Sequence, residues 1–260
     1  MDSNKNLIFL HLPKNGGTTT NAILKRIYPK KNTFEIKVID KVHLNTQEFI
    51  DLSLEERKEI HLLQGHMKFG LHEHMVGPSE YITFLRKPED RIISFYYYVL
   101  ASPGHRLHKK IKEENMSFYE FVTTIDQRDV NNAQVRYISG IFEDENTMLE
   151  KALENIDKYF SFVGLTERFD ESLILLKHIY KLNTPYYRSL NKTSKRITSK
   201  ELDQKTKDAI AELNRGDVLL YEAMEKKFNS ELENITSLKS DLFKLKIYNK
   251  LYSSYKKFRK

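Results

Sequence analysis

Cysteine is absent from this chain of 260 residues. Disulfides, thiolate metal sites and a cysteine nucleophile are therefore excluded, and the composition suits a reducing compartment. Long apolar runs are absent as well. No stretch is long enough to span a bilayer, and the run at 7–12 is too short for the core of a signal peptide. We therefore expect a cytoplasmic protein.

The body of the chain also lacks an excess of charge of either sign. The formal net charge is +7, but residues 239–260 hold eight Lys and Arg residues against Asp241 alone, which leaves 35 basic and 35 acidic residues elsewhere. We therefore expect no nucleic-acid partner. Any contact with a membrane surface or another polyanion would belong to this basic tail.

Short apolar strands alternate with helical patterns along most of the sequence. Ser53 with Glu56, and Ser117 with Glu120, have the spacing of capping boxes. The alternation predicts an α/β fold with a central parallel sheet covered by helices on both faces. The expected strands are 7–11, 33–38, 60–64, 81–86 and 160–165, and the main expected helices are 18–28, 88–100, 169–180, 199–214 and 217–228.

The first strand leads into a loop that has the composition of a phosphate site. Lys14, Gly16, Gly17 and the hydroxyls of Thr18 and Thr19 precede or open a helix, whose N–H groups and positive dipole end favour an anion. The order is not that of a Walker A loop, because the lysine stands before the glycines. A phosphate geometry other than that of a P-loop kinase is therefore indicated.

Two further polar segments, at 65–74 and 86–94, each follow an expected strand. Since ligands of parallel sheets bind at the carboxyl ends of the strands, we expect these segments and the loop to border one crevice.

Four stretches together form a recognisable pattern: FLHLPKNGGTT at 9–19, QGHMKFG at 64–70, FLRKPEDRIISF at 84–95 and FVGLTERFDES at 162–172. They resemble the sulfotransferases that use 3′-phosphoadenosine 5′-phosphosulfate (PAPS), in particular the carbohydrate group that includes heparan sulfate 2-O-sulfotransferase. The resemblance implies a P-loop-like three-layer sandwich with C-terminal helices. It divides the chain into a sulfotransferase domain, 1–230, and a basic amphipathic helical tail, 231–260.

The resemblance also implies how the sulfuryl donor is held. The first stretch implies that Lys14, Asn15, Gly16, Gly17, Thr18 and Thr19 bind the 5′-phosphosulfate, with Lys14 also supporting the leaving phosphate. Either threonine is equally suited to capping the helix. The third stretch implies that Arg86 and Ser94 bind the 3′-phosphate. Lys192 lies in a loop that matches the family's nucleotide-closing loop approximately. No metal is implied.

The catalytic base implied by the resemblance is His66, since a neutral imidazole suits proton abstraction near neutral pH. His11, His72 and His74 are the competing histidines; His11 is also interpreted as an orienting or core residue. His72 and His74 have one residue between them, and the sequence shows no obvious motif that would add a third metal ligand.

Three other segments allow more than one interpretation. The tyrosines at 96–98 suit packing or a sugar-stacking surface, and Asn132 and Gln134 suit the acceptor cleft or the surface of a helix. In the tail, Leu238, Leu242, Leu245, Tyr248, Tyr252 and Tyr255 predict an amphipathic helix with a lysine-rich opposite face. This helix suits an anionic surface, a partner helix or its own domain.

The sequence therefore predicts a PAPS-dependent O-sulfotransferase that acts on a hydroxyl of an acceptor, expected to be a saccharide. One alternative is an ATP-dependent P-loop-like kinase, which the order of the loop disfavours. The other is a non-catalytic nucleotide-binding or polyanion-binding module that works through the tail.

Overall fold

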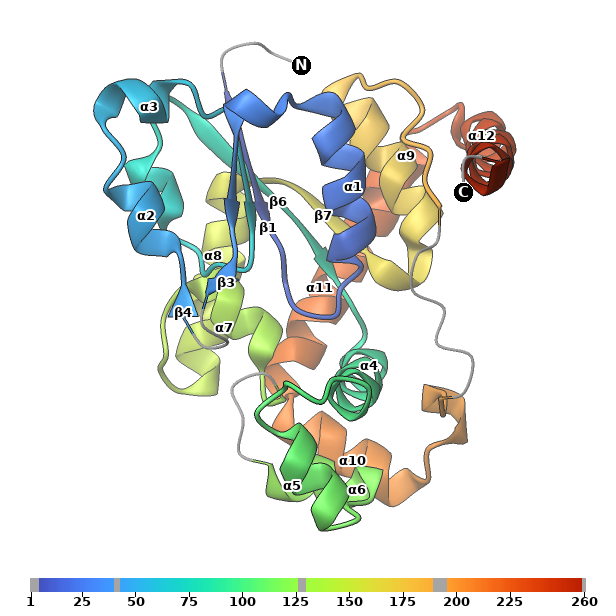
Figure 1. Cartoon of the computed structure of the whole chain (residues 1–260). Helices are drawn as coiled ribbons and strands as arrows, with labels where there is room; N and C mark the ends of the chain where they lie inside the picture. Colours follow the sequence, from blue (N-terminus) through green and yellow to red (C-terminus); the bar gives the residue numbers. More distant parts are fainter. Residues whose placement is uncertain (1–4, 40–42, 126–129, 189–195, 259–260) are drawn as a thin grey trace.

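A five-stranded sheet forms the centre of the computed structural model, which describes residues 5–39, 43–125, 130–188 and 196–258 (Figure 1). The strand order is β2-β5-β1-β6-β7, and all four strand pairs are parallel. The strands are β1 (Asn6–Leu10), β2 (Thr33–Ile36), β5 (Leu62–Gly65), β6 (Ser79–Leu85) and β7 (Phe160–Leu165). Every residue of β1 and β5 is buried, as expected for strands in the middle of a parallel sheet.

Helices cover both faces of this sheet. One face carries α1 (Gly17–Ile27) and α9 (Phe169–Tyr180), and the other carries α8 (Glu145–Tyr159). Beside α8, α11 (Arg215–Glu233) packs against the edge strand β7. The expected α/β class with a central parallel sheet is therefore confirmed.

A second group of helices lies beyond the carboxyl ends of the strands, at the bottom of Figure 1. It has its own apolar core, centred on side chains such as Phe95, Phe121 and Ile210, which is separate from the core around the sheet. Its members are α4 (Pro88–Leu100), α5 (His108–Glu113), α6 (Phe118–Thr124) and α10 (Gln204–Leu213). The main sheet and this helical group therefore meet where the three polar segments are expected to converge.

Local signals located the boundaries of several elements. The observed bounds of α4, α9 and β7 coincide with the expected ones, and both capping boxes are formed, Ser53 with Glu56 and Ser117 with Glu120. The single helix expected at 199–214 is wrong, because a short 3-10 turn at Ser199–Glu201 precedes α10. The remaining elements are β3 (Val38–Ile39), β4 (His43–Leu44), α2 (Thr46–Ile50), α3 (Leu54–Lys58), α7 (Ala133–Ser139) and short 3-10 turns at Lys30–Asn32, Leu71–His74 and Thr166–Arg168.

The C-terminal helix α12 (Leu238–Phe258) packs beside α9. Leu245 is fully buried in the core around the sheet, and Asp241 accepts hydrogen bonds from Lys177 and His178 at 2.7 and 2.8 Å. The expected boundary after residue 230 lies inside α11. Within the described segments, no helix combines the length and apolarity that crossing a bilayer requires.

Candidate active site

The loop between β1 and α1 contains two residues with left-handed backbone conformations. Lys14 has φ 70° and Gly16 has φ 77°. Glycine adopts this conformation readily, whereas a lysine there costs roughly 1–2 kcal/mol. Strained residues of this kind concentrate at functional sites, where the surrounding structure holds them. The strain at Lys14 therefore makes this loop a candidate functional site.

Gly17 allows the start of α1 to approach the ring of His11. A Cβ on Gly17 would stand 1.8 Å from two atoms of that ring, which no side chain tolerates. The N-cap of α1 is Gly16, so the interpretation of Thr18 or Thr19 as its cap is wrong. Thr18 is exposed and Thr19 is half-buried in the first turn. Both hydroxyls therefore stand at the positive end of the helix dipole, where an anion would be bound.

Three cations gather at the loop. The guanidinium of Arg86 donates to the backbone carbonyl oxygen of Lys14 at 3.0 Å, so the end of β6 is tied to the loop. Burial, with Arg86 and Arg196 nearby, lowers the pKa of Lys14 to about 8. Burial also lowers the pKa of Arg86, and Arg196 lowers it further. Like charges held together at a cost in free energy indicate a site that an anion would neutralise.

Glu167 offsets part of this positive charge. One carboxylate oxygen lies 3.8 Å from Nε of Arg86 and accepts the N–H of Lys87 at 3.1 Å, while the other accepts the hydroxyl of Tyr221 at 3.1 Å. Burial raises the pKa of Glu167. The carboxylate thus fixes the turn between β6 and α4 and orients the Arg86 side chain.

Asn15 points into the protein. Its amide nitrogen donates to the carbonyl oxygen of Phe84 and to Oε1 of Gln134, both at 2.7 Å, and its side chain is 1% exposed. Gln134 in turn accepts the N–H of Arg86 and donates to its carbonyl oxygen, both at 2.9 Å. The side chain of Asn15 therefore anchors the loop to β6. Only the backbone of Asn15 is left to contact a bound anion.

Gln134 is itself held by α11. Its backbone N–H and that of Val135 donate to the two carboxylate oxygens of Asp217 at 3.1 and 2.9 Å. Asp217 is fully buried and lies 3.9 Å from Nε of Arg91 on α4. A buried polar network therefore connects the loop, the end of β6, α7 and α11, and such networks define one geometry when their members are hydrogen-bonded.

His66 stands next to the loop, just after β5. Its Nδ1 lies 3.0 Å from the carbonyl oxygen of His11, and the two rings stack with centroids 4.2 Å apart. Because a carbonyl oxygen only accepts, Nδ1 of His66 carries the proton, and in the neutral ring Nε2 is the basic nitrogen. Gly65 has φ 138°, and a Cβ there would meet the carbonyl oxygen of Ile36 at 2.0 Å, so glycine is required before the histidine.

Two of the competing histidines, His11 and His72, have structural partners for their rings. Burial, with His66 and Lys14 nearby, lowers the pKa of His11 to about 3, so its ring is neutral and unsuited to taking a proton. His72 packs among aromatic rings, and its Nδ1 lies 3.1 Å from the hydroxyl of Tyr81. The carbonyl oxygen of His74 accepts from Arg57. In the described residues, His, Asp and Glu side chains nowhere form a group of three able to hold a metal ion.

Helix α4 contributes the other predicted residue, Ser94, which is half-buried. One turn later, the ring of Tyr98 lies under Nζ of Lys14 at 4.1 Å. The four-residue spacing puts Ser94 on the same side of α4 as Tyr98 and therefore toward the loop. The hydroxyl of Tyr96 donates to the carbonyl oxygen of Met116, and the hydroxyl of Tyr97 accepts the backbone N–H of Ile197. These contacts favour the interpretation of both tyrosines as packing residues. Lys192 lies outside the described residues.

The structure thus brings Lys14, Arg86 and His66 to one edge of the sheet. Sequence reasoning did not connect Tyr98, Glu167 and Asp217 with the loop. It assigned Gln134 to the acceptor cleft or to the surface of a helix, whereas the residue is 1% exposed and bonded to Asn15. Gln134 is separated from Asn15 by 119 residues, and no local pattern marks that pairing. A polar residue between apolar ones, as at Gln134, is the one signal that the sequence offered.

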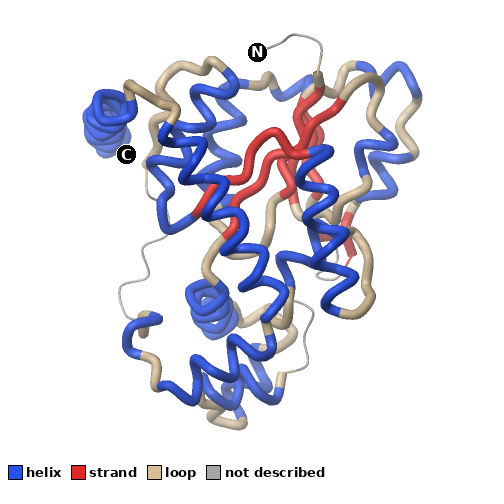
Figure 2. The backbone as a smooth tube through the Cα atoms, turned by 180° about the vertical axis from the view of Figure 1, so that it is seen from behind, coloured by secondary structure: helices blue, strands red, loops and turns tan. Residues whose placement is uncertain are grey.

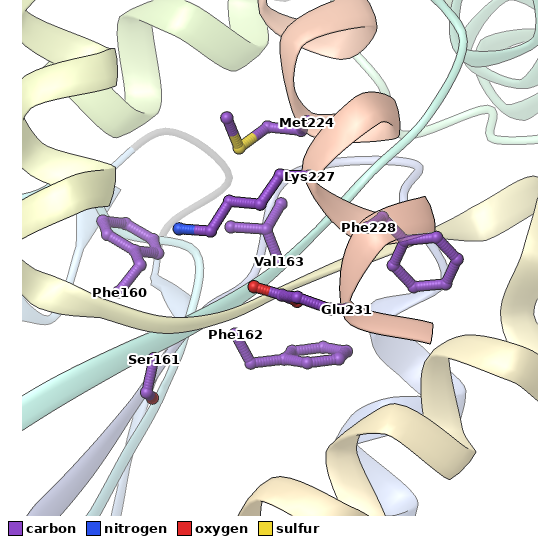
Figure 3. A pocket seen from close by; sticks show the side chains of 8 residues that line it. All are labelled: Phe160, Ser161, Phe162, Val163, Met224, Lys227, Phe228 and Glu231. Atoms are coloured by element: carbon purple, nitrogen blue, oxygen red, sulfur yellow. The ribbon is translucent and has the colours of Figure 1, made fainter. Parts of the chain in front are cut away.

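Two cavities of the described residues lie away from the predicted site residues. Figure 3 shows a cleft between β7 and α11, where Lys227 and Glu231 extend over Phe160 and Phe162. Its volume is about 10 Å³, room for roughly one water. A larger cavity of about 280 Å³ lies among Leu7, Tyr28 and Tyr180. Neither contains a predicted site residue, so the candidate site is the loop surface and not one of these two cavities.

A family model described as the sulfotransferase family matches residues 1–222. The chain is 26% identical over 226 residues to a heparin sulfate O-sulfotransferase of Drosophila melanogaster, covering 77% of this chain and 65% of that protein. It is 23% identical over 188 residues to uronyl 2-sulfotransferase of Homo sapiens, covering 62% and 45%. The chain therefore spans less than two thirds of the length of these relatives.

Two solved structures resemble the fold more distantly. A sulfotransferase from Alicyclobacillus acidocaldarius aligns with a TM-score of 0.47 at 13% identity, covering 85% of this chain and 96% of that one. A mouse sulfotransferase complexed with PAP aligns with a TM-score of 0.41 at 12% identity, covering 91% and 88%.

Proposed function

The chain belongs to the sulfotransferase family, and from this premise we propose that it transfers a sulfuryl group from PAPS to a hydroxyl of a saccharide. The observation that carries the proposal is the placement of His66, with its tautomer set by the His11 carbonyl oxygen, beside the cationic loop of Lys14 and Arg86. The names of the relatives, which refer to heparin sulfate and uronyl groups, support a carbohydrate acceptor.

The residues present suit a ligand with phosphates at two positions. Lys14, the backbone from Asn15 to Gly17, and Thr18 and Thr19 would hold the 5′ end, since they combine a cation with the amino end of α1. Arg86 and Ser94 would hold the 3′-phosphate, because the fork of an arginine suits a phosphate dianion. Lys192 is proposed to assist from the later loop. The bound donor supplies the activated sulfuryl group.

Lys14 stabilises the negative charge that develops on the leaving phosphate. Its pKa of about 8 keeps most of the lysine charged near neutral pH, and a bound anion increases that fraction. The contact of its Nζ with the Tyr98 ring, at 4.1 Å, restrains the long side chain. Such pre-positioned charge is the main way in which enzymes assist transfer of this kind.

His66 removes the proton of the acceptor hydroxyl through Nε2. The carbonyl oxygen of His11, 3.0 Å from Nδ1, accepts the Nδ1 proton's hydrogen bond throughout and stabilises the imidazolium that forms. This is the role that a carboxylate or carbonyl group has behind a general base in other enzymes. No step assigned to the chain's residues requires a metal. We also propose that the reaction takes place in the cytoplasm.

The kinase alternative is not favoured by the family. It predicts tight binding of ADP or ATP with magnesium, whereas the sulfotransferase proposal predicts tight binding of 3′-phosphoadenosine 5′-phosphate without metal. Isothermal calorimetry with these ligands distinguishes the two. ADP binding as tightly as the 3′-phosphorylated nucleotide would refute the proposal.

A variant makes the calorimetry specific for the 3′-phosphate. Arg86→Ala removes the proposed charged fork, so the dissociation constant of 3′-phosphoadenosine 5′-phosphate should rise about 10- to 100-fold, with a smaller change for ADP. Lys110→Ala, at an exposed position on α5, is the matched control and should leave both affinities unchanged. Transfer of radiolabelled sulfate from PAPS to desulfated heparin tests the acceptor class.

A further inference from the structure

The outer face of α12 carries three exposed apolar side chains in a line. Phe243, Ile247 and Leu251 are spaced four residues apart and are 66%, 43% and 61% exposed. Phe243 and Leu251 have the two highest exposed fractions among the large apolar side chains of the described segments. Four-residue spacing places side chains on one side of a helix, so the three form a continuous stripe. We call it the outer stripe.

The outer stripe is distinct from the face with which α12 packs on the protein. That inner face buries Leu245, and Asn249 accepts the backbone N–H of Tyr187 at 2.6 Å. Tyr252 meets the ring of Tyr186 at 5.0 Å, with Arg26 of α1 above both rings. Because the inner face is already satisfied by the protein's own residues, the outer stripe is not needed for docking α12.

Lysines border the outer stripe on both sides. At 100° per residue, Lys239, Lys246 and Lys250 follow the stripe along one side and Lys244 borders it on the other, and all four are exposed. The one acidic residue of α12, Asp241, lies on the inner face, buried and bonded to Lys177 and His178. The exposed surface of α12 is therefore apolar in the middle and positively charged at its edges.

We propose that the outer face of α12 binds flat on an anionic lipid surface. An apolar stripe flanked by lysines is the pattern of a helix lying in the membrane interface, where the stripe enters the acyl boundary and the lysines extend toward the headgroups. The charge argues for this occupant over a second copy of the chain, since pairing two such faces would bring eight lysines together. The apolar stripe argues against a saccharide, which would leave Phe243, Ile247 and Leu251 in contact with water.

The position of α12 is compatible with a working site. Figures 1 and 2 both place α12 beside α9, away from the helical group that borders the carboxyl ends of the strands. A lipid surface on the outer face therefore leaves Lys14 and Arg86 accessible. The proposal does not depend on the proposed function, because it rests only on the exposed side chains of α12. Changes on this face should leave the affinity for the nucleotide unaffected.

Co-sedimentation with vesicles tests the proposal. The full chain should bind vesicles that contain phosphatidylserine at least tenfold more tightly than vesicles of phosphatidylcholine alone, and added salt should weaken the binding. Equal binding to both vesicles, or none, would overturn the proposal.

Two variants separate the apolar from the charged contribution. Phe243→Ser/Ile247→Ser/Leu251→Ser should weaken binding to phosphatidylserine vesicles on the order of a hundredfold. Lys239→Gln/Lys244→Gln/Lys246→Gln/Lys250→Gln should weaken it by a similar factor. The substituted side chains are all exposed, and circular dichroism verifies that each variant is folded.

Matched controls carry the same chemical changes elsewhere. Leu54→Ser/Leu219→Ser removes exposed apolar side chains from α3 and α11, and Lys109→Gln/Lys110→Gln/Lys112→Gln removes charge from α5. Both should bind vesicles like the unaltered chain. If the triple serine variant binds vesicles normally, the stripe has no role in membrane binding. If it instead converts a dimer to a monomer in sedimentation velocity, the face is an interface between copies.

Discussion

The ring of His66 stacks on the ring of His11 at a centroid distance of 4.2 Å, and its Nδ1–H donates to the carbonyl oxygen of the same residue. One residue at the end of β1 thus sets both the orientation and the tautomer of a residue at the end of β5. Parallel pairing of these two strands brings the residues together, since Leu10 lies opposite Gly65 in the register. His66 and the loop that follows β1 are therefore positioned by the same strand pair.

His66→Ala should lower turnover by about 10²- to 10⁴-fold, because the acceptor hydroxyl loses its general base. The affinity for 3′-phosphoadenosine 5′-phosphate should stay within about twofold, since His66 is not among the proposed nucleotide ligands. Single-turnover assays and calorimetry measure the two effects. His74→Ala, in the 3-10 turn at Leu71–His74, serves as the control and should retain turnover. Retained turnover in His66→Ala would remove this residue from the mechanism.

The affinity for 3′-phosphoadenosine 5′-phosphate should fall as the pH rises through about 8. Lys14 has a lowered pKa of about 8, so the unliganded protein holds this charge below that pH and loses it above. Binding of an anion favours the charged form, and the nucleotide must therefore supply the free energy of protonation at higher pH. Calorimetry across the range from about pH 6.5 to about pH 9.5 measures this dependence. In Lys14→Met the affinity should be weaker and nearly independent of pH in that range; a similar slope in both proteins would exclude Lys14 as its source.

Gly17→Ala should destabilise the fold by about 1–3 kcal/mol, because the added methyl collides with the His11 ring. Gly104→Ala is the matched control: no atom lies within 4 Å of the place that its methyl would take, so its stability should change little. Urea unfolding measures both. The double variant His11→Ala/Gly17→Ala should regain part of the loss, since the smaller side chain removes the clash. Strict additivity of the two single changes would show that the collision is relieved elsewhere.

Gln134→Leu should destabilise the fold by about 2–4 kcal/mol. The change leaves the amide of Asn15 short of an acceptor and both backbone groups of Arg86 short of a partner in a buried region. Gln204→Leu, on the exposed surface of α10, is the control and should stay within about 0.5 kcal/mol. Urea unfolding at neutral pH provides the comparison. A small loss for Gln134→Leu would mean that water replaces the amide in the network.

The fold was predictable where local signals and burial patterns agree. Continuous apolar segments identified the strands β1, β5, β6 and β7, and proline at the first turn located the start of α4. The division of the helices into two groups with separate cores was not predictable. The apolar residues of α4 recur with the same helical period as those of the helices that cover the sheet. This period does not say which of the two cores a side chain joins.

By itself, the sequence determined the make-up of the loop after β1 that predicts a phosphate site, because the order of lysine, glycines and hydroxyls is a local property of consecutive residues. It also determined that the net positive charge of the chain resides in the tail. Only the tertiary structure decided that Asn15 faces inward to Gln134, that the His11 carbonyl sets the tautomer of His66, and that the outer face of α12 is apolar between lysines. These relationships join residues far apart in the chain or depend on which side of a helix is already covered, and no run of neighbouring residues encodes either.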